Sequence, residues 1–116
     1  MQGKRLDRVN QLIKEEVSML LQRELKDPRL GFVTVTEVET SKDLRSAKIF
    51  VSVLGDDGQW KASMAALESA RGFVRNWLRQ HLELRVTPEL DFRPDHSLEH
   101  AARIQSLLKQ VRAPGS

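Results

Sequence analysis

Three arginines recur at intervals of four residues in the middle of the chain, at positions 71, 75 and 79. On a helix of about 3.6 residues per turn, each step of four advances about 40° around the axis, so these side chains form a slowly winding row. A guanidinium group offers a planar fork of donors that binds phosphate through two hydrogen bonds. The row therefore predicts contact with successive phosphates of a nucleic acid. The alternative interpretation is a charged helix face that contacts only water.

Two more basic clusters occur, one near the amino terminus and one in the centre of the sequence, whereas pairs of acidic residues lie elsewhere. The net charge is only +3, so the distribution of charge matters more than its sum. Basic clusters that converge in space would form a surface for a polyanion such as RNA. The candidate RNA-binding residues are Arg5, Arg8, Arg45, Lys48, Arg71, Arg75 and Arg79.

Patterns typical of catalysis are weak in this sequence. His96 and His100 lie four apart and could share one zinc ion, but no third ligand is evident. An exposed polar helix start explains them more simply. Paired carboxylates such as Glu37 and Glu39 fit the solvated face of a strand better than acid–base chemistry. The sequence also has no nucleophile elbow and no phosphate-binding glycine loop. We therefore predict a non-enzymatic protein without a metal or cofactor.

The composition is that of one ordinary globular domain. The chain has 116 residues, of which 40% are hydrophobic and 30% charged. It has no cysteine, which excludes disulfides and thiolate metal sites and suits a reducing cytoplasm. No apolar run approaches the roughly 20 residues that span a bilayer, and the amino terminus lacks the apolar segment of a signal peptide. We expect a cytoplasmic protein that does not contact a membrane.

The arginine row needs a helix, and a helical pattern surrounds it from Gln59 to Leu82. Gly72 lies inside this pattern, where glycine costs roughly 1 kcal/mol relative to alanine. We therefore predict two helices, 59–70 and 73–82, that meet at a kink formed by Ala70, Arg71 and Gly72. Asp57 is a plausible cap for the first of them.

The other elements follow from apolar periodicity. The pattern predicts an amphipathic helix from Arg5 to Lys26, a strand from Phe32 to Thr40, and a second strand from Arg45 that ends before Gly55. A short strand spans 88–94, and Asp95 can cap a last helix. The buried stripe expected on this last helix is Leu98, Ala101, Ala102, Ile104, Leu107, Leu108 and Val111.

These elements predict an α+β fold in which helices cover one face of a three-stranded sheet. The other face can contact water or a ligand. The connection from the second strand to the third should be right-handed if those strands are parallel. Phe50 points outward with Lys48, so it either offers a base a stacking surface or is covered by the last helix.

Several segments, in this order, resemble the ribosome-binding factor A family. They are Leu-Lys-Asp-Pro-Arg-Leu at 25–30, Val-Thr-Val-Thr at 33–36, Ala-Arg-Gly at 70–72 and Pro-Glu-Leu-Asp-Phe at 88–92. The resemblance extends from about Arg5 to Leu108.

The resemblance implies a bacterial, type II KH-like domain, here residues 1–112 followed by a short disordered tail, 113–116. It implies a factor that binds the free small (30S) ribosomal subunit late in assembly. Such factors support maturation of the 16S rRNA, particularly its 5′ end, and matter most in the cold. The usual Gly-x-x-Gly loop of KH domains is replaced in the family by an Ala-x-Gly kink, which residues 70–72 match. We expect a monomer that docks on folded rRNA.

Two other functions remain open on the sequence. The first is a protein-interaction module that docks on a ribosomal protein or an assembly GTPase. The second is a metal-dependent nuclease that uses His96 and His100.

Overall fold

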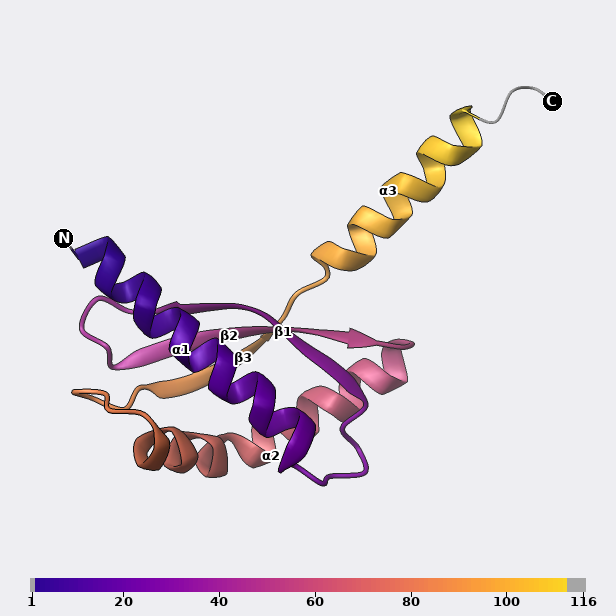
Figure 1. The fold of residues 1–116 in the computed structure, drawn as a ribbon. Helices are drawn as coiled ribbons and strands as arrows, with labels where there is room; N and C mark the ends of the chain where they lie inside the picture. Colours follow the sequence, from indigo (N-terminus) through magenta and orange to yellow (C-terminus); the bar gives the residue numbers. More distant parts are fainter. Residues whose placement is uncertain (1, 113–116) are drawn as a thin grey trace.

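The computed structural model describes residues 2–112, and the tail predicted at 113–116 lies outside them. These residues form three helices and three strands, which confirms the predicted α+β class (Figure 1). No helix within residues 2–112 is long and apolar enough to cross a bilayer. The elements are α1 (Gln2–Arg23), β1 (Phe32–Thr40), β2 (Ser46–Leu54), α2 (Asp57–His81), β3 (Glu89–Pro94) and α3 (Ser97–Arg112).

The strands form one mixed sheet in the order β1-β2-β3. β1 and β2 are antiparallel and form the predicted hairpin, while β3 pairs in parallel with β2. Because parallel neighbours need a crossover, α2 carries the chain from β2 to β3. The first residue of β3 is Glu89, whose N–H donates to the carbonyl of Arg45 at 2.8 Å. This bond places the α2–β3 loop beside the β1–β2 turn.

The hydrophobic core lies between the sheet and two helices, α1 and α2. Strand residues alternate between this core and an open face, so Ile49 and Val51 are fully buried while Lys48 is exposed. Phe50 is half-buried on the open face. The prediction that helices pack on one face of the sheet is confirmed for α1 and α2. Their fully buried core residues are Ile13, Val17, Leu20, Leu67, Val74 and Leu78.

The prediction of two helices around Gly72 is wrong, because α2 is one helix of 25 residues. Its ribbon changes direction near the middle, so the predicted kink is a bend within a continuous helix (Figure 1). Gly72 is exposed and keeps a helical conformation. No feature at this position requires the helix to break. The cap is also one residue earlier than predicted. Asp56 accepts the N–H of Gln59 at 2.9 Å, and the Gln59 side chain accepts the N–H of Asp56.

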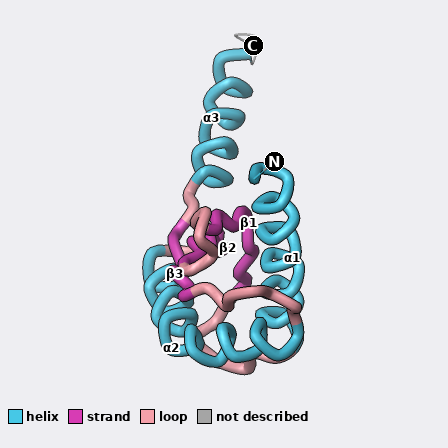
Figure 2. Tube along the Cα trace, turned by 90° about the vertical axis from the view of Figure 1, so that its left-hand side faces the viewer, coloured by secondary structure: helices cyan, strands magenta, loops and turns pink. Residues whose placement is uncertain are grey.

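The prediction that the last helix buries an apolar stripe is also wrong. α3 projects away from the sheet and the other two helices (Figures 1 and 2). The predicted contact of Asp95 with the start of this helix is present. Oδ1 of Asp95 accepts the N–H of Ser97, the first residue of α3, at 2.9 Å. Val111 lies outside the described side chains. The large side chains of the stripe are exposed by about half: Leu98 57%, Ile104 57%, Leu107 54% and Leu108 48%.

Candidate nucleic-acid interface

The three arginines of α2 form a row on one helix, as their spacing predicts, and they line one hollow. Arg71, Arg75 and Arg79 line it from the helix, and Thr87 and Glu89 line it from the α2–β3 loop and the start of β3. The hollow has a volume of about 450 Å³. α2 therefore places the guanidinium groups in a row.

Each arginine of this row already has a partner within the molecule. Arg71 pairs with Glu68, one turn earlier on α2, with 3.1 Å between Nη1 and Oε1. Arg79 donates from Nη2 to the side-chain oxygen of Asn76 at 2.6 Å. Both are exposed contacts, which are individually weak. A phosphate can therefore replace them at small cost.

Arg75 is held more firmly than its neighbours. Its guanidinium donates to the carbonyls of Thr87 at 3.0 Å and Pro88 at 3.2 Å, and Nη2 lies 3.5 Å from a carboxylate oxygen of Glu89. Charged donors bound to two backbone carbonyls fix the loop that leads into β3. Arg75 thus acts first as a positioning residue for this loop.

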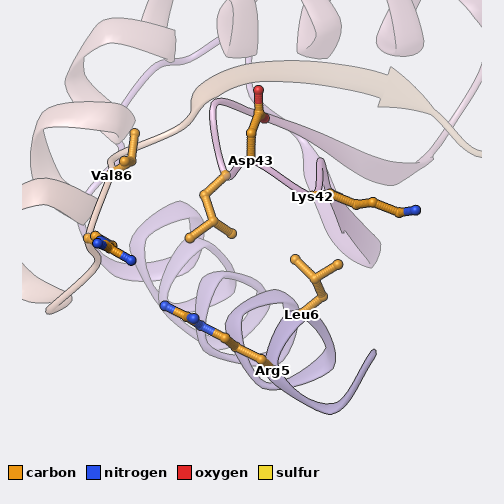
Figure 3. Close-up of a pocket in the computed structure, with 7 residues that line it drawn as sticks. Arg5, Leu6, Lys42, Asp43 and Val86 are labelled. Atoms are coloured by element: carbon orange, nitrogen blue, oxygen red, sulfur yellow. The ribbon is translucent and has the colours of Figure 1, made fainter. Parts of the chain in front are cut away.

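A second group of basic side chains gathers where three segments meet. Arg5 of α1, Lys42 of the β1–β2 turn and Arg85 of the α2–β3 loop surround a hollow of about 330 Å³. Arg8 lies one helical turn after Arg5 and shares an adjacent crevice with Arg5 and Arg85. We call Arg5, Arg8, Lys42 and Arg85 the basic junction. Arg5 reaches toward the loop that carries Val86, while Lys42 extends in another direction (Figure 3).

The basic junction differs from the α2 row in its pairing. Within the described part of the chain, none of its four side chains forms an ion pair. Asp43 is the acid in the first hollow, but its carboxylate points away from Arg5 (Figure 3). Oδ1 of Asp43 accepts the Ser41 hydroxyl at 2.7 Å and the N–H of Arg45 at 3.1 Å. These bonds, that from Ser41 above all, lower the pKa of Asp43. The Asp43 carboxylate therefore interacts with the β1–β2 turn.

The turn beside the junction contains a backbone outlier. Leu44 has a φ of 62°, in the left-handed region that side chains rarely adopt. Such a conformation costs about 1 to 3 kcal/mol and persists only where the surroundings impose it. Here the N–H of Leu44 donates to the carbonyl of Ser41 at 2.9 Å, and the side chain lines both hollows of the junction.

Two predicted RNA-binding residues do not join either group. Lys48 is exposed on the open face of the sheet, opposite the helices, and its strand neighbours are Glu39 and Asp91. Arg45 projects from the end of the β1–β2 turn with its side chain 81% exposed, 3.9 Å from Asp43. Lys48 therefore lies on a different face of the molecule from the α2 row, with the sheet between them.

The histidines considered for zinc have other surroundings. Nδ1 of His96 lies 3.0 Å from Glu99, and its ring packs on Trp60 with 4.1 Å between centroids. The described residues contain no group of three or more histidine, cysteine or acidic side chains arranged to hold a metal.

Sequence reasoning missed Lys42 and Arg85 as members of the site. Neither belongs to a periodic pattern, because each lies in a connection between elements. Their proximity to Arg5 arises only from the fold. The one available signal was the basic character of each connection.

A family model described as "Ribosome-binding factor A" matches residues 5–108. The chain belongs to the ribosome-binding factor A family. A relative of that name from Halothermothrix orenii is 49% identical over 112 residues, which cover 97% of this chain and 92% of the relative.

Solved structures of the family share the fold. The crystal structure of ribosome-binding factor A from Thermus thermophilus matches with a TM-score of 0.69 and 26% identity, over 77% of this chain and 94% of that one. A Thermus thermophilus model fitted into a cryo-EM map of a 30S complex matches with a TM-score of 0.63 and 27% identity, over 74% and 90% of the two chains.

The segments that resemble the family have structural roles in this chain. Asp27 accepts the N–H of Arg29 and both Nε and Nη2 of its side chain, at 2.7 to 3.1 Å, which closes the turn after α1. In the later segment, the carbonyl of Pro88 accepts a hydrogen bond from Nε of Arg75, and the side chains of Leu90 and Phe92 are buried in the core. The later segment thus holds the α2–β3 loop in place beside the basic residues, whereas the earlier one closes the turn after α1.

Proposed function

We propose that this chain is a non-enzymatic assembly factor that binds the free small ribosomal subunit. In this proposal it supports late maturation and 5′-end processing of 16S rRNA in the cytoplasm, as a monomer, and is needed most in the cold. Residues 1–112 act as one KH-like RNA-binding unit. Family membership supports the proposal, and so does the Thermus thermophilus relative that has been fitted into a map of a 30S complex.

The observation that carries the proposal is the unpaired charge of the basic junction. Four cations that form no ion pair with the described residues 2–112 favour an external polyanion, and rRNA presents closely spaced phosphates. Phosphate contacts position a protein on RNA but carry little sequence information. The factor therefore recognises the folded subunit through the spacing of its cations.

The α2 row extends the same surface. Arg71 and Arg79 can exchange their weak internal partners for phosphates, whereas Arg75 maintains the loop between the row and the junction. Binding holds the RNA in an arrangement that can mature, and the factor leaves when the subunit is complete. No bond in the RNA is broken by the protein.

A second candidate function is docking on a ribosomal protein or an assembly GTPase. The exposed apolar stripe of α3 favours it, because leucine and isoleucine side chains at helical spacing are typical of a helix that binds a protein groove. Binding to such a partner in the absence of RNA, with weak salt dependence, would support this candidate.

Co-sedimentation with purified small subunits tests the RNA-binding proposal. Changing Arg5, Arg8 and Arg85 together to glutamate should abolish sedimentation with the subunit, while Arg71→Glu with Arg79→Glu should weaken it. Far-ultraviolet circular dichroism checks that both variants fold.

A matched control reverses the same number of charges elsewhere. Arg23, Lys61 and Arg103 are exposed and lie outside the junction and the row. Their change to glutamate should leave sedimentation nearly intact. If the junction variant sediments as the wild type does, this surface is not the one that binds the subunit. RNA cleavage that is lost on changing His96 and His100 would favour a nuclease instead.

A further inference from the structure

A crevice beside the basic junction combines charged and apolar lining residues. It lies between the start of α1 and the α2–β3 loop and has a volume of about 470 Å³, within the range of small-molecule pockets. Its charged lining residues are Arg5, Arg8, Arg85 and Glu83. Its apolar lining residues are Val9, Leu12, Leu44, Leu82 and Leu84. A site for phosphate alone does not need an apolar lining.

The aromatic member of the crevice is His81, the last residue of α2. Its ring stacks on Trp77, with 3.9 Å between centroids and 10° between the planes. Nδ1 lies 2.9 Å from the carbonyl of Trp77, and because a carbonyl only accepts, Nδ1 carries the proton.

The Trp77 ring of this stack is itself held by a hydrogen bond. The indole N–H of Trp77 donates to Glu16 of α1 at 2.8 Å, which joins α2 to α1. The imidazole is therefore held flat on an indole that is itself anchored. A rigid aromatic surface of this kind suits a nucleobase, because every base has a face that can stack.

We propose that the crevice holds one unpaired nucleotide of an RNA, with its base stacked on His81 and its phosphates on Arg5, Arg8 and Arg85. The inference deepens the proposed function and rests on it, since the RNA would be part of the small subunit. A base in a duplex is stacked on both sides and cannot enter the crevice, so the nucleotide must be in a loop, a bulge or an end. The three guanidinium groups, which form no ion pair in the part of the chain that the structure describes, supply the complementary charge.

The test uses a short single-stranded RNA that carries 2-aminopurine, a base whose fluorescence falls when it stacks. The full chain should quench this fluorescence. His81→Ala should abolish the quenching and weaken binding about tenfold, the effect of losing one base stack. His81→Phe should restore both, because it replaces one flat ring with another. His100→Ala is the matched control, since His100 is an exposed histidine on α3, and it should behave as the wild type does.

Two competitors identify the ligand. A duplex of the same length should displace the single strand poorly, and 2-aminopurine riboside monophosphate should bind far more weakly than the oligonucleotide. Equal competition by the duplex, or equal binding by His81→Ala and the wild type, would overturn the inference. Tighter binding of the free mononucleotide would overturn it as well, because the ligand would then be a small molecule rather than RNA.

Sedimentation with small subunits separates this inference from the function on which it rests. One outcome is that the wild type sediments with small subunits while His81→Ala quenches the probe as strongly as the wild type does. In that case the crevice assignment fails and the proposed function stands. If the wild type does not sediment, the proposed function fails whatever the probe shows.

Discussion

Gly72 lies in the interior of α2, but nothing in the structure requires a glycine there. The backbone is helical, and a Cβ atom added at this position meets nothing within 4 Å beyond the adjacent residues and the backbone of its own helix. Alanine favours the helix and restricts the unfolded chain, so Gly72→Ala should raise the free energy of unfolding by about 1 kcal/mol. Urea denaturation measures this change. A decrease would show that the bend of α2 depends on glycine.

Gly55 provides the matched control for this substitution. Its φ is 148°, and an added Cβ would collide with the side chain of Gln59, which completes the cap of α2. Gly55→Ala should therefore lower the free energy of unfolding by about 1 to 3 kcal/mol. The same glycine-to-alanine change thus has opposite signs at two positions that border or occupy one helix.

Asp95 makes stability depend on pH in the acid range. Its Oδ2 accepts the hydroxyl of Thr36 at 2.6 Å and Oδ1 accepts the N–H of Ser97. These bonds, that of Thr36 first, lower the pKa of Asp95 below its usual value of 3.8. Because the folded pKa is depressed, the stabilisation is present above the unfolded pKa and is lost as the pH falls through the folded pKa.

Asp95→Asn should accordingly be less stable than the wild type at neutral pH and should lose less stability on acidification. The free energy of unfolding, measured from neutral pH down to about pH 2, tests this expectation. Parallel curves for the two proteins would mean that Asp95 contributes nothing to the acid sensitivity.

At the scale of elements, the α2–β3 loop connects the arginine row to the junction. Arg75 bonds two carbonyls of this loop, whereas Arg71 pairs only with an exposed glutamate. Arg75→Ala should therefore lower the free energy of unfolding by about 1 to 2 kcal/mol. Arg71→Ala should change it by less than about 0.5 kcal/mol. Equal effects in thermal or urea denaturation would contradict the positioning role of Arg75.

The elements with clear periodicity could be predicted from the sequence, and the rest show what periodicity leaves out. β1 has the bounds predicted, and β2 alternates as expected, because each strand has one face in the core. The apolar stripe of α3 predicted a helix correctly but not its placement. A periodic apolar stripe shows that a helix can bury one face. It does not show whether another element of the same chain packs on that face.

The same limit applies to the site. The row on α2 follows from spacing within one helix. The partners of Arg75 and the proximity of Arg5 to Arg85 depend on contacts between residues far apart in the sequence. A glycine penalty predicted a break at Gly72, but α2 continues through it with Ala70 and Val74 buried on either side, because the penalty is only about 1 kcal/mol.

At the scale of the whole molecule, the cationic surface exists only in the folded state. The start of α1, the β1–β2 turn and the α2–β3 loop each contribute to the junction. The bond from Glu89 to the carbonyl of Arg45 keeps two of these segments adjacent. With a net charge of only +3, this local concentration of unpaired cations determines where a polyanion binds.

The salt dependence of subunit binding therefore reports how many phosphates this surface neutralises. Each phosphate that an arginine binds releases counterions, so the logarithm of the affinity falls linearly with the logarithm of the salt concentration. Arg5→Gln with Arg8→Gln should reduce the magnitude of that slope by about 2, one for each arginine replaced. Affinity for small subunits over a series of potassium chloride concentrations gives the slope.

Arg23→Gln with Arg103→Gln should leave this slope unchanged, because both residues lie outside the surface. If the junction variant binds more weakly but keeps the wild-type slope, Arg5 and Arg8 do not bind phosphates, and they act on binding through the shape of the crevice.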